Sequence, residues 1–236
     1  MQFGVLGPLV VWDATGRPTG VPERKVRALL ARLLLADGAP VTADRLLDDI
    51  WGDQLPANPG AVLRSKLSQL RRVLDEAEPN GRDRLTHQPA GYTLQLAAAG
   101  TGHDEDLDAR RFQTLVSQAG HSHDPAAVEQ ALTQALDLWR GPFLADLADD
   151  DFIRSAALHW EERRLAAVEQ RAETRLAMGR PQALIHELAE LLDSHPRREQ
   201  LRGLLMQALY HAGRQGDALD LYEQHRLTLR DNHGLS

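Results

Sequence analysis

The sequence predicts a mainly α-helical protein with a small amount of β-structure, divided into a mixed N-terminal part and an all-helical C-terminal part. The first 21 residues carry short runs of Val, Leu and aromatic residues broken by Gly and Pro, which is typical of strands. From residue 22 onward, apolar residues recur mainly at helical spacing. A stretch of small residues without periodicity, 97–102, separates the two parts.

The N-terminal part begins with three predicted strands, Gln2–Leu6, Leu9–Trp12 and Pro18–Val21. Three predicted helices follow, and each has a boundary signal. The first ends at Gly38, and the second begins after a Thr42 N-cap. The third begins at Asn58-Pro59, an N-cap followed by Pro at the first helical position, and runs to about Glu76.

Two more predicted strands, Arg84–Gln88 and Tyr92–Leu96, form a hairpin around Pro89-Ala90-Gly91. The complete order is three strands, three helices and a hairpin. This order is that of a winged helix-turn-helix, in which the third helix enters a DNA groove. We therefore predict a winged helix over residues 1–97, with mainly α-helix and little β-structure overall.

Residues 98–104 are the predicted linker, and the sequence after them has the pattern of helices. Gly179-Arg180 and Gly213-Arg214 each end one predicted helix and precede another, and they lie 34 residues apart. That period is typical of tetratricopeptide repeats. We expect a tetratricopeptide-like domain over residues 105–236, and stacked helix pairs of this kind present surfaces to protein or peptide partners. The predicted helices cover about 106–119, 125–139, 150–178, 182–194, 198–212 and 216–230.

Charge is distributed unevenly along the 236 residues, whose formal net charge is −7. Residues 1–97 hold 12 Lys or Arg against 11 Asp or Glu, whereas residues 98–236 hold 15 against 23. Such asymmetry indicates different partners for the two parts. The absence of Cys excludes disulfides, Cys-ligated zinc and a thiol nucleophile. With no secretory signal pattern and no apolar run near the roughly 18 residues of a membrane span, we expect a cytoplasmic protein without a membrane partner.

The third predicted helix carries the strongest functional signal. Its apolar residues fall in one arc of a helical wheel: Val62, Leu63, Leu67, Leu70, Val73 and Leu74. The opposite face holds no acid and combines three guanidinium groups with small side chains: Ala61, Arg64, Ser65, Ser68, Gln69, Arg71 and Arg72. Arg binds phosphates or guanine edges, Gln reads adenine, and small residues admit the backbone. Taken alone, this helix is equally consistent with a face that reads DNA and with an ordinary basic surface. Its position as the third helix of a predicted winged helix favours the DNA-reading interpretation.

Lys66 is an irregularity because its direction lies inside the apolar arc of that helix. We expect its stem to pack on the edge of the core and its ammonium to extend to solvent. Lys66 is therefore not counted with the DNA-reading face.

Seven segments together form a recognisable pattern. In the first part they are Arg24–Leu30, Val41–Gly52, Leu67–Leu74 and Pro89–Tyr92, and in the second part Leu138–Leu147, Glu161–Glu169 and Leu209–Arg214. The first four resemble an OmpR-type winged helix as found in the Streptomyces antibiotic regulatory protein (SARP) family. The last three resemble the bacterial transcriptional activation domain of that family. The resemblance covers nearly the whole chain, in order.

The resemblance implies a transcriptional activator without a cofactor. Family members bind direct repeats that overlap the −35 region of promoters, side by side, and contact RNA polymerase and its principal sigma factor. They usually switch on gene clusters for secondary metabolites such as antibiotics. Family members also usually continue for another helix or two beyond the position of Ser236, and some carry further domains.

The resemblance also implies roles for individual residues. Positions matching Ser65 and Gln69 face bases, and the position matching Trp51 donates its indole N–H to a phosphate. Gln88 of the hairpin stands where the family commonly has Arg, and Gln gives a weaker, less salt-sensitive contact. Positions matching Ala61, Ser68 and Arg71 lie along the DNA backbone. The complete candidate set is Trp51, Ala61, Arg64, Ser65, Ser68, Gln69, Arg71, Arg72, His87 and Gln88.

Three other classes of protein are alternatives to a transcriptional activator. An enzyme is disfavoured because we find no phosphate loop, zinc-protease motif or nucleophile elbow. His121 and His123 lack further metal ligands and fit a solvated loop, and Asp149–Asp151 fits a helix start. A tetratricopeptide-like interaction scaffold that does not bind DNA is the main alternative, and it leaves the acid-free face unexplained. A nonspecific DNA binder is disfavoured by the near-neutral charge of residues 1–97.

Overall fold

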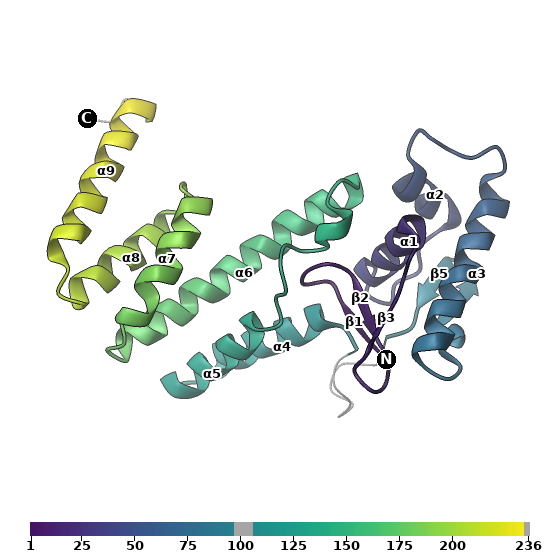
Figure 1. The fold of residues 1–236 in the computed structure, drawn as a ribbon, viewed down its shortest axis with the longest axis horizontal. Coiled ribbons are helices and arrows are strands. Elements are labelled where there is room, and N and C mark those ends of the chain that lie inside the picture. Colours follow the sequence, from purple (N-terminus) through teal and green to yellow (C-terminus); the bar gives the residue numbers. More distant parts are fainter. Residues whose placement is uncertain (97–105, 234–236) are drawn as a thin grey trace. The chain divides into compact units, whose positions relative to one another are not determined.

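The computed structural model describes residues 1–96 and 106–233, and its backbone is shown in Figure 1. The chain forms two compact units, each described here by itself. Unit 1 comprises Met1–Leu115 together with Ala135–Arg163, and unit 2 comprises Val116–Gln134 together with Arg164–Ser236. The predicted linker, 98–104, lies outside the described residues, so the predicted boundary between domains stays a prediction. Residues 106–115 and 135–163 nevertheless group with the predicted winged helix and not with the remaining C-terminal residues.

Unit 1 opens with a three-stranded antiparallel sheet in the order β1-β2-β3, formed by β1 (Gln2–Gly4), β2 (Val10–Trp12) and β3 (Pro18–Thr19). Phe3 pairs with Val11, and Val11 pairs with Thr19. The side chains of Phe3 and Val11 are fully buried. The strands lie where the sequence predicts them and are shorter, because Gly-Pro and turn residues interrupt the pairing.

Three helices follow: α1 (Arg24–Leu35), α2 (Ala43–Trp51) and α3 (Pro59–Ala77). The predicted N-caps of α2 and α3 are confirmed. Thr42 Oγ1 accepts the Arg45 N–H at 3.2 Å, and Asn58 Oδ1 accepts the Ala61 N–H at 3.2 Å. Leu29, Leu30 and Leu33 of α1 are completely buried, so α1 forms the centre of this core.

A 3₁₀ turn, η1 (Gly81–Arg84), leads into the predicted hairpin of β4 (Leu85–Gln88) and β5 (Gly91–Leu94). Gln88 pairs with Gly91, so the loop between the strands contains two residues. The base of the hairpin is attached to the segment before α2, where Val41 and Tyr92 exchange backbone hydrogen bonds of 2.9 and 2.8 Å. The predicted winged-helix order, mainly α with a small β part, is confirmed.

Unit 1 is completed by the first part of α4 (Asp108–His121), the end of α5 (Pro125–Leu136), a turn η2 (Ala145–Leu147) and the first part of α6 (Asp151–Ala177). The loop between α5 and η2 returns to the N-terminal strands. The Arg140 backbone N–H donates to Leu6 O at 2.7 Å, and the Leu144 N–H donates to Val5 O at 3.0 Å. The signature segment Leu138–Leu147 therefore packs on the N-terminal sheet region.

Unit 2 contains the remaining parts of α4, α5 and α6 with α7 (Gln182–Ser194), α8 (Glu199–His211) and α9 (Gln215–His233). The predicted 34-residue period is visible in Gly179 and Gly213, which both have positive φ angles (72° and 80°) after a helix. Leu188 of α7 and Leu201 of α8 are fully buried, so the helices pack through apolar faces. Within the described residues, no helix is both long enough and apolar enough to cross a bilayer.

Candidate nucleic-acid interface

Helix α3 is held in place by the apolar arc that the sequence predicts. Leu63, Leu67, Leu70, Val73 and Leu74 are all buried, while Val62 is half-buried at the edge. These residues pack against α1 and α2. Burying one arc of the helix leaves the opposite arc facing outward, because α-helical residues three and four apart lie on one side.

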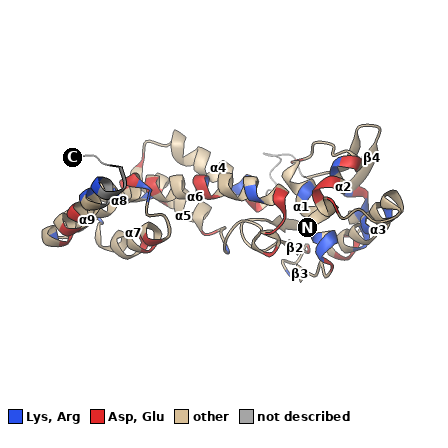
Figure 2. Cartoon of the chain, turned by 90° about the horizontal axis from the view of Figure 1, so that it is seen from above, with Lys and Arg blue, Asp and Glu red and all other residues tan. Residues whose placement is uncertain are grey.

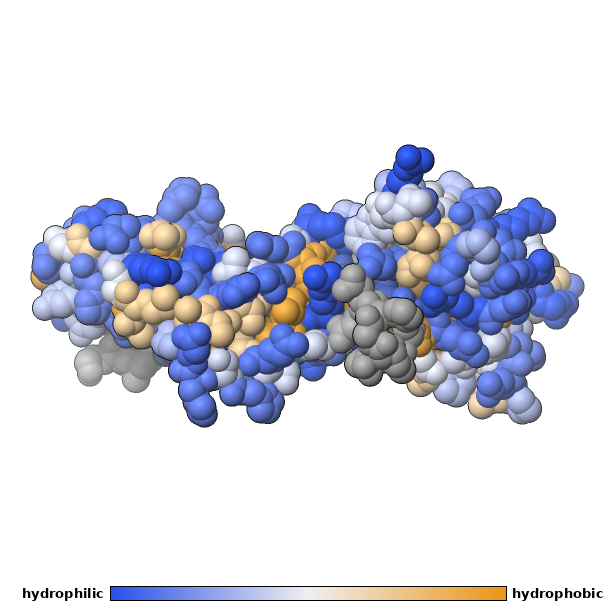
Figure 3. All heavy atoms as spheres, turned by 90° about the horizontal axis from the view of Figure 1, so that it is seen from below, coloured by the Kyte–Doolittle hydropathy of each residue, from blue (hydrophilic) through white to orange (hydrophobic). Residues whose placement is uncertain are grey.

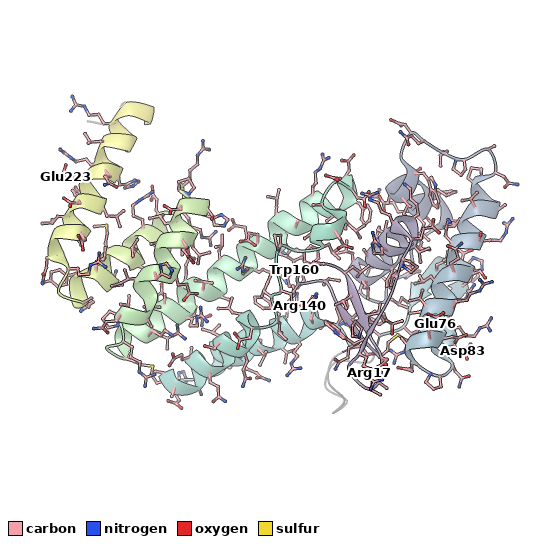
Figure 4. The ribbon with its side chains drawn as sticks, in the orientation of Figure 1. Arg17, Glu76, Asp83, Arg140, Trp160 and Glu223 are labelled. Carbon is pink, nitrogen blue, oxygen red and sulfur yellow. The ribbon has the colours of Figure 1, made fainter. Side chains whose placement is uncertain are left out.

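The outward arc of α3 carries the predicted DNA-reading residues. Arg64, Ser65, Ser68 and Arg72 are exposed, and Ala61, Gln69 and Arg71 are half-buried. Within the described part of the chain, neither Arg64 nor Arg72 has an ion-pair or hydrogen-bond partner, so both guanidinium groups remain available. The acids of α3, Asp75 and Glu76, are confined to its last turn (Figures 2 and 4).

Arg71 differs from its neighbours on this arc. Its guanidinium Nη2 donates to the backbone carbonyl of Leu85 in β4 at 3.1 Å. The bond connects the middle of α3 to the start of the hairpin. Arg71 therefore positions the hairpin relative to α3 in addition to presenting charge, a role that the helical wheel does not reveal.

Lys66 does not extend freely to solvent. Its side chain is 19 % exposed, and its ammonium pairs with the Glu23 carboxylate at 2.5 Å, just before α1. The expectation that its stem packs near the core is consistent with this low exposure, and the ammonium extends to a partly exposed carboxylate that the sequence did not predict as its partner. A local pattern cannot anticipate the pair, because Glu23 is distant in sequence.

Trp51, the last residue of α2, is half-buried. The Lys25 ammonium lies over its ring, 5.5 Å from the centroid, and also donates to the Ile50 carbonyl at the end of α2. A cation over an indole face is favourable, and this one also binds a free carbonyl at a helix C-terminus. Sequence reasoning did not select Lys25, since the contact joins two different helices.

The hairpin presents the two other predicted residues. His87 and Gln88 are both exposed at the end of β4. The His87 ring stacks on Tyr92 of β5 with centroids 4.4 Å apart, so its orientation is set by the opposite strand. Gly91 has φ of +132°, and a Cβ at this position would lie 2.3 Å from Val41 O. Only glycine permits this close approach of the hairpin to the segment before α2.

A cluster of charges anchors the junction of α3, η1 and the hairpin. Arg84 pairs with Glu78 at 3.0 Å and with Asp106 at 2.5 Å. Burial raises the pKa of Glu78, but hydrogen bonds from the amino group of Met1 and from Arg84 outweigh it and hold the pKa below its usual value. The net effect keeps Glu78 ionised and the cluster intact at neutral pH.

Two basic residues at the start of α1 are neutralised within unit 1. Arg24 pairs with Asp150 at 3.0 Å, and Arg27 pairs with Asp146 at 3.2 Å. Asp146 also accepts the Leu9 N–H at 2.8 Å. The sequence predicts only that the acids at 149–151 lie at the start of a helix. It does not predict that Asp150 pairs with Arg24. The guanidinium groups of Arg64 and Arg72 on α3, by contrast, have no partner among the described residues and are candidates for binding an external anion.

One face of the winged-helix part can be seen to be polar. The face of the winged-helix part that is turned to the viewer in Figure 3, at its right, is mostly hydrophilic, with apolar residues in small groups.

Across residues 1–96 and 106–233 there is no group of three or more His, Asp or Glu side chains suited to hold a metal ion. His121 hydrogen-bonds through Nδ1 to the Ser117 carbonyl of its own helix.

Comparison with known families assigns the two parts. Residues 21–94 match the family "Transcriptional regulatory protein, C terminal", and residues 107–236, more than half of the chain, match "Bacterial transcriptional activator domain". The regulatory protein DnrI of Streptomyces peucetius is 33% identical over 243 residues, and the match covers 100% of this chain and 87% of DnrI. The chain belongs to the SARP family.

Other SARP-type relatives are longer than this chain. The regulatory protein AfsR of Streptomyces coelicolor is 37% identical over 239 residues, covering 100% of this chain and 23% of AfsR. The transcriptional regulatory protein EmbR of Mycobacterium tuberculosis is 36% identical, with 100% of this chain and 60% of EmbR covered. The chain thus spans about a quarter of the first relative and three-fifths of the second.

The fold of this SARP-family chain is also found in a solved structure. The structure of Mycobacterium tuberculosis EmbR in complex with a low affinity phosphopeptide superimposes with a TM-score of 0.86 at 34% sequence identity. The match covers 100% of this chain and 61% of the EmbR chain. The predicted combination of a winged helix and an activator domain is confirmed by the family matches and by this likeness.

Proposed function

We propose that this chain is a sequence-specific DNA-binding transcriptional activator, that it has no enzymatic activity, and that α3 reads the major groove of promoter DNA. The observation that carries the proposal is the outward arc of α3, where Arg64 and Arg72 have no partner in the described chain and acids are confined to the last turn. A buried opposite arc and a helix N-cap hold that arc rigidly. Rigid presentation of unpaired guanidinium groups suits recognition of an anionic groove.

The individual roles are those that the resemblance to the family implies, and the chemistry of the side chains is compatible with them. Gln69 and Ser65 are assigned to base edges, and Arg64 and Arg72 to phosphates or guanine. Ala61 and Ser68 are small enough to let the DNA backbone come close. Trp51 is assigned to a phosphate through its indole N–H, and His87 and Gln88 to the backbone or minor groove beside the hairpin.

The acidic second part is assigned to protein partners. We propose that residues 105–236 contact RNA polymerase and its principal sigma factor, and that protomers bind side by side on direct repeats in the nucleoid of the cytoplasm. The near-neutral charge of residues 1–97 supports pairing on repeated half-sites, since one protomer supplies few phosphate contacts. The similarity to DnrI and AfsR supports a role in a secondary-metabolite cluster.

The test is a footprint of the 236-residue chain on the promoters beside its own gene, with and without RNA polymerase. We expect protection of direct repeats that is strengthened by polymerase. In the absence of polymerase, the double variant Arg64→Ala/Arg72→Ala should lose the footprint, whereas Arg154→Ala/Arg214→Ala, which removes two exposed charges from α6 and beside α9, should keep it. An unchanged footprint in the α3 variant would exclude the proposed interface.

The alternative is an interaction scaffold that does not bind DNA. The helices α7 to α9 alone would satisfy it, because they form a repeat-like array. A scaffold would give no footprint on any neighbouring promoter. It would bind its protein partners equally well with and without the α3 substitutions. The same experiment therefore separates the two functions.

A further inference from the structure

Trp51 is the proposed DNA contact that lies outside both α3 and the hairpin. It is the last residue of α2, and Gly52, with φ of +52°, ends the helix directly after it. The indole is half-buried, and its Nε1 has no hydrogen-bond partner within residues 1–96 and 106–233. Because helix ends fray, the direction of a side chain at this position depends on support from another element.

Lys25, in the first turn of α1, supports Trp51 in two ways. Its ammonium lies over the indole, 5.5 Å from the ring centroid, which is a favourable place for a cation. The same ammonium donates a hydrogen bond to the carbonyl of Ile50, the residue before Trp51, at the C-terminus of α2. One cation therefore holds both the backbone and the ring at the end of this helix.

The acid closest in sequence to these residues does not take part in this arrangement. Asp49, whose side chain is largely buried, is bound by Arg32 of α1 at 2.6 Å and by Arg45 at 3.0 Å. In the described parts of the chain Lys25 has no carboxylate partner, so its ammonium stays with the carbonyl and the ring. Two contacts thus join α1 to α2. The Arg32–Asp49 pair touches no proposed DNA contact, whereas the Lys25 contact ends on one.

We propose that Lys25 is a positioning residue for DNA binding, which fixes the plane of the Trp51 indole so that its N–H donates to a phosphate of the DNA backbone. This inference rests on the proposed function, because it requires Trp51 to contact DNA. Lys25 acts through Trp51 and not through a phosphate of its own, since its half-buried ammonium is already engaged by the carbonyl and the ring. Its effect should therefore depend on the indole N–H and leave the salt dependence of binding unchanged.

The test is a double-mutant cycle on the affinity of the 236-residue chain for the promoter DNA beside its own gene, titrated at several salt concentrations. Lys25→Met removes the ammonium and keeps an apolar stem, and should weaken binding about fivefold. Trp51→Phe keeps an aromatic ring without the N–H, and should weaken binding about tenfold. The double variant should bind as Trp51→Phe does. Lys25→Arg, which restores a cation, should recover most of the parent affinity.

Two comparisons separate positioning from other roles. Lys25→Met should keep the salt slope of the parent, whereas Arg72→Ala should lower it by about 0.9. Arg32→Met removes the other contact between α1 and α2, and should lower the melting temperature while leaving the DNA affinity of the folded chain unchanged. Melting curves without DNA establish that each variant is folded. If Lys25→Met does not fold, Lys25→Gln, which keeps an N–H donor, replaces it in the cycle.

Four results would overturn the proposal. They are a parent-like affinity of the folded Lys25 variant, an equal loss with and without Trp51→Phe, a salt slope lowered by about 0.9, and an equal loss of affinity in Arg32→Met. The third would show a phosphate contact of Lys25 itself, and the fourth a general effect of weakened packing. Failure of the proposed function is distinguishable, because Arg64→Ala/Arg72→Ala would then also bind DNA as the parent does.

Discussion

The carboxylate of Asp108, at the start of α4, pairs with the guanidinium of Arg140 at 3.1 Å (Figure 4 labels Arg140). The same carboxylate accepts the backbone N–H groups of Val5, at 2.9 Å, and Leu6, at 3.1 Å. Arg140 in turn lies over the Trp12 ring and donates to Pro8 O at 2.9 Å. The pair therefore attaches the signature loop and α4 to the N-terminal strands within unit 1.

Arg140→Ala should lower the free energy of unfolding by roughly 2 kcal/mol at pH 7, because it leaves a largely buried carboxylate without its cation. Burial raises the pKa of Asp108, and the N–H groups of Val5 and Leu6 and the Arg140 pair only partly offset this. Asp108 is thus protonated in acid, where the pair no longer contributes. Because the pKa of Asp108 in the folded chain lies above the usual Asp value, the loss caused by Arg140→Ala should begin to shrink at a pH above that value and be smallest below it.

Chemical denaturation at pH 7 and at low pH measures this dependence. Asp108→Asn is the partner variant for a double-mutant cycle, since its amide oxygen still accepts from the backbone. A coupling energy near zero at pH 7 would contradict the pair.

Arg71→Ala and Arg72→Ala should separate structure from DNA contact. Arg72 has no partner among residues 1–96 and 106–233, so Arg72→Ala should leave stability unchanged and reduce the salt slope of DNA binding by about 0.9. Arg71→Ala should weaken specific and random DNA alike and also destabilise the chain by roughly 1 kcal/mol, because Leu85 O loses its donor. Binding titrations at several salt concentrations measure the salt slope, and thermal melts measure the change in stability. Equal melting temperatures for both variants would be evidence against the structural role of Arg71.

Gln69→Ala should change which DNA sequences bind more than it changes overall affinity. An amide that reads adenine contributes roughly 1–3 kcal/mol of discrimination against other bases. Selection from a randomised operator, compared with the parent chain, should show relaxed preference at one base-pair position in each half-site. Ser155→Ala, on exposed α6 surface, serves as the control, and an unaltered preference in Gln69→Ala would remove this residue from the reading face.

Gly91→Ala should destabilise unit 1 by about 3 kcal/mol and displace the hairpin, because φ of +132° strains any other residue and the new Cβ would collide with Val41 O. Gly38→Ala is the matched control. Gly38 also has a positive φ, +85°, but open space around it, so its cost should be about 1 kcal/mol. Equal losses in denaturation experiments would show that backbone strain alone, and not the close approach, determines the effect.

Local signals predicted much of the fold correctly. The caps at Thr42 and Asn58, the apolar arc of α3, and the hairpin around residues 89 and 90 all depend on neighbours within one or two turns. The exposure of Arg64, Ser65 and Ser68 follows from the same periodicity. The partners of Lys66 and Arg71 were not predicted. A helical wheel gives the direction of each side chain around one helix, but it does not show which residues of other elements lie opposite.

The sequence by itself determined the order of the elements, the acid-free arc of α3 and the family, since each depends on residue type and spacing along the chain. The tertiary structure decided which charges remain available. It pairs Arg24 and Arg27 with Asp150 and Asp146, and it gives Arg64 and Arg72 no partner within the described parts of the chain. It also groups residues 135–163 with the winged helix. The physical reason is that ion pairs and tertiary packing depend on distances through space between residues that sequence spacing does not relate.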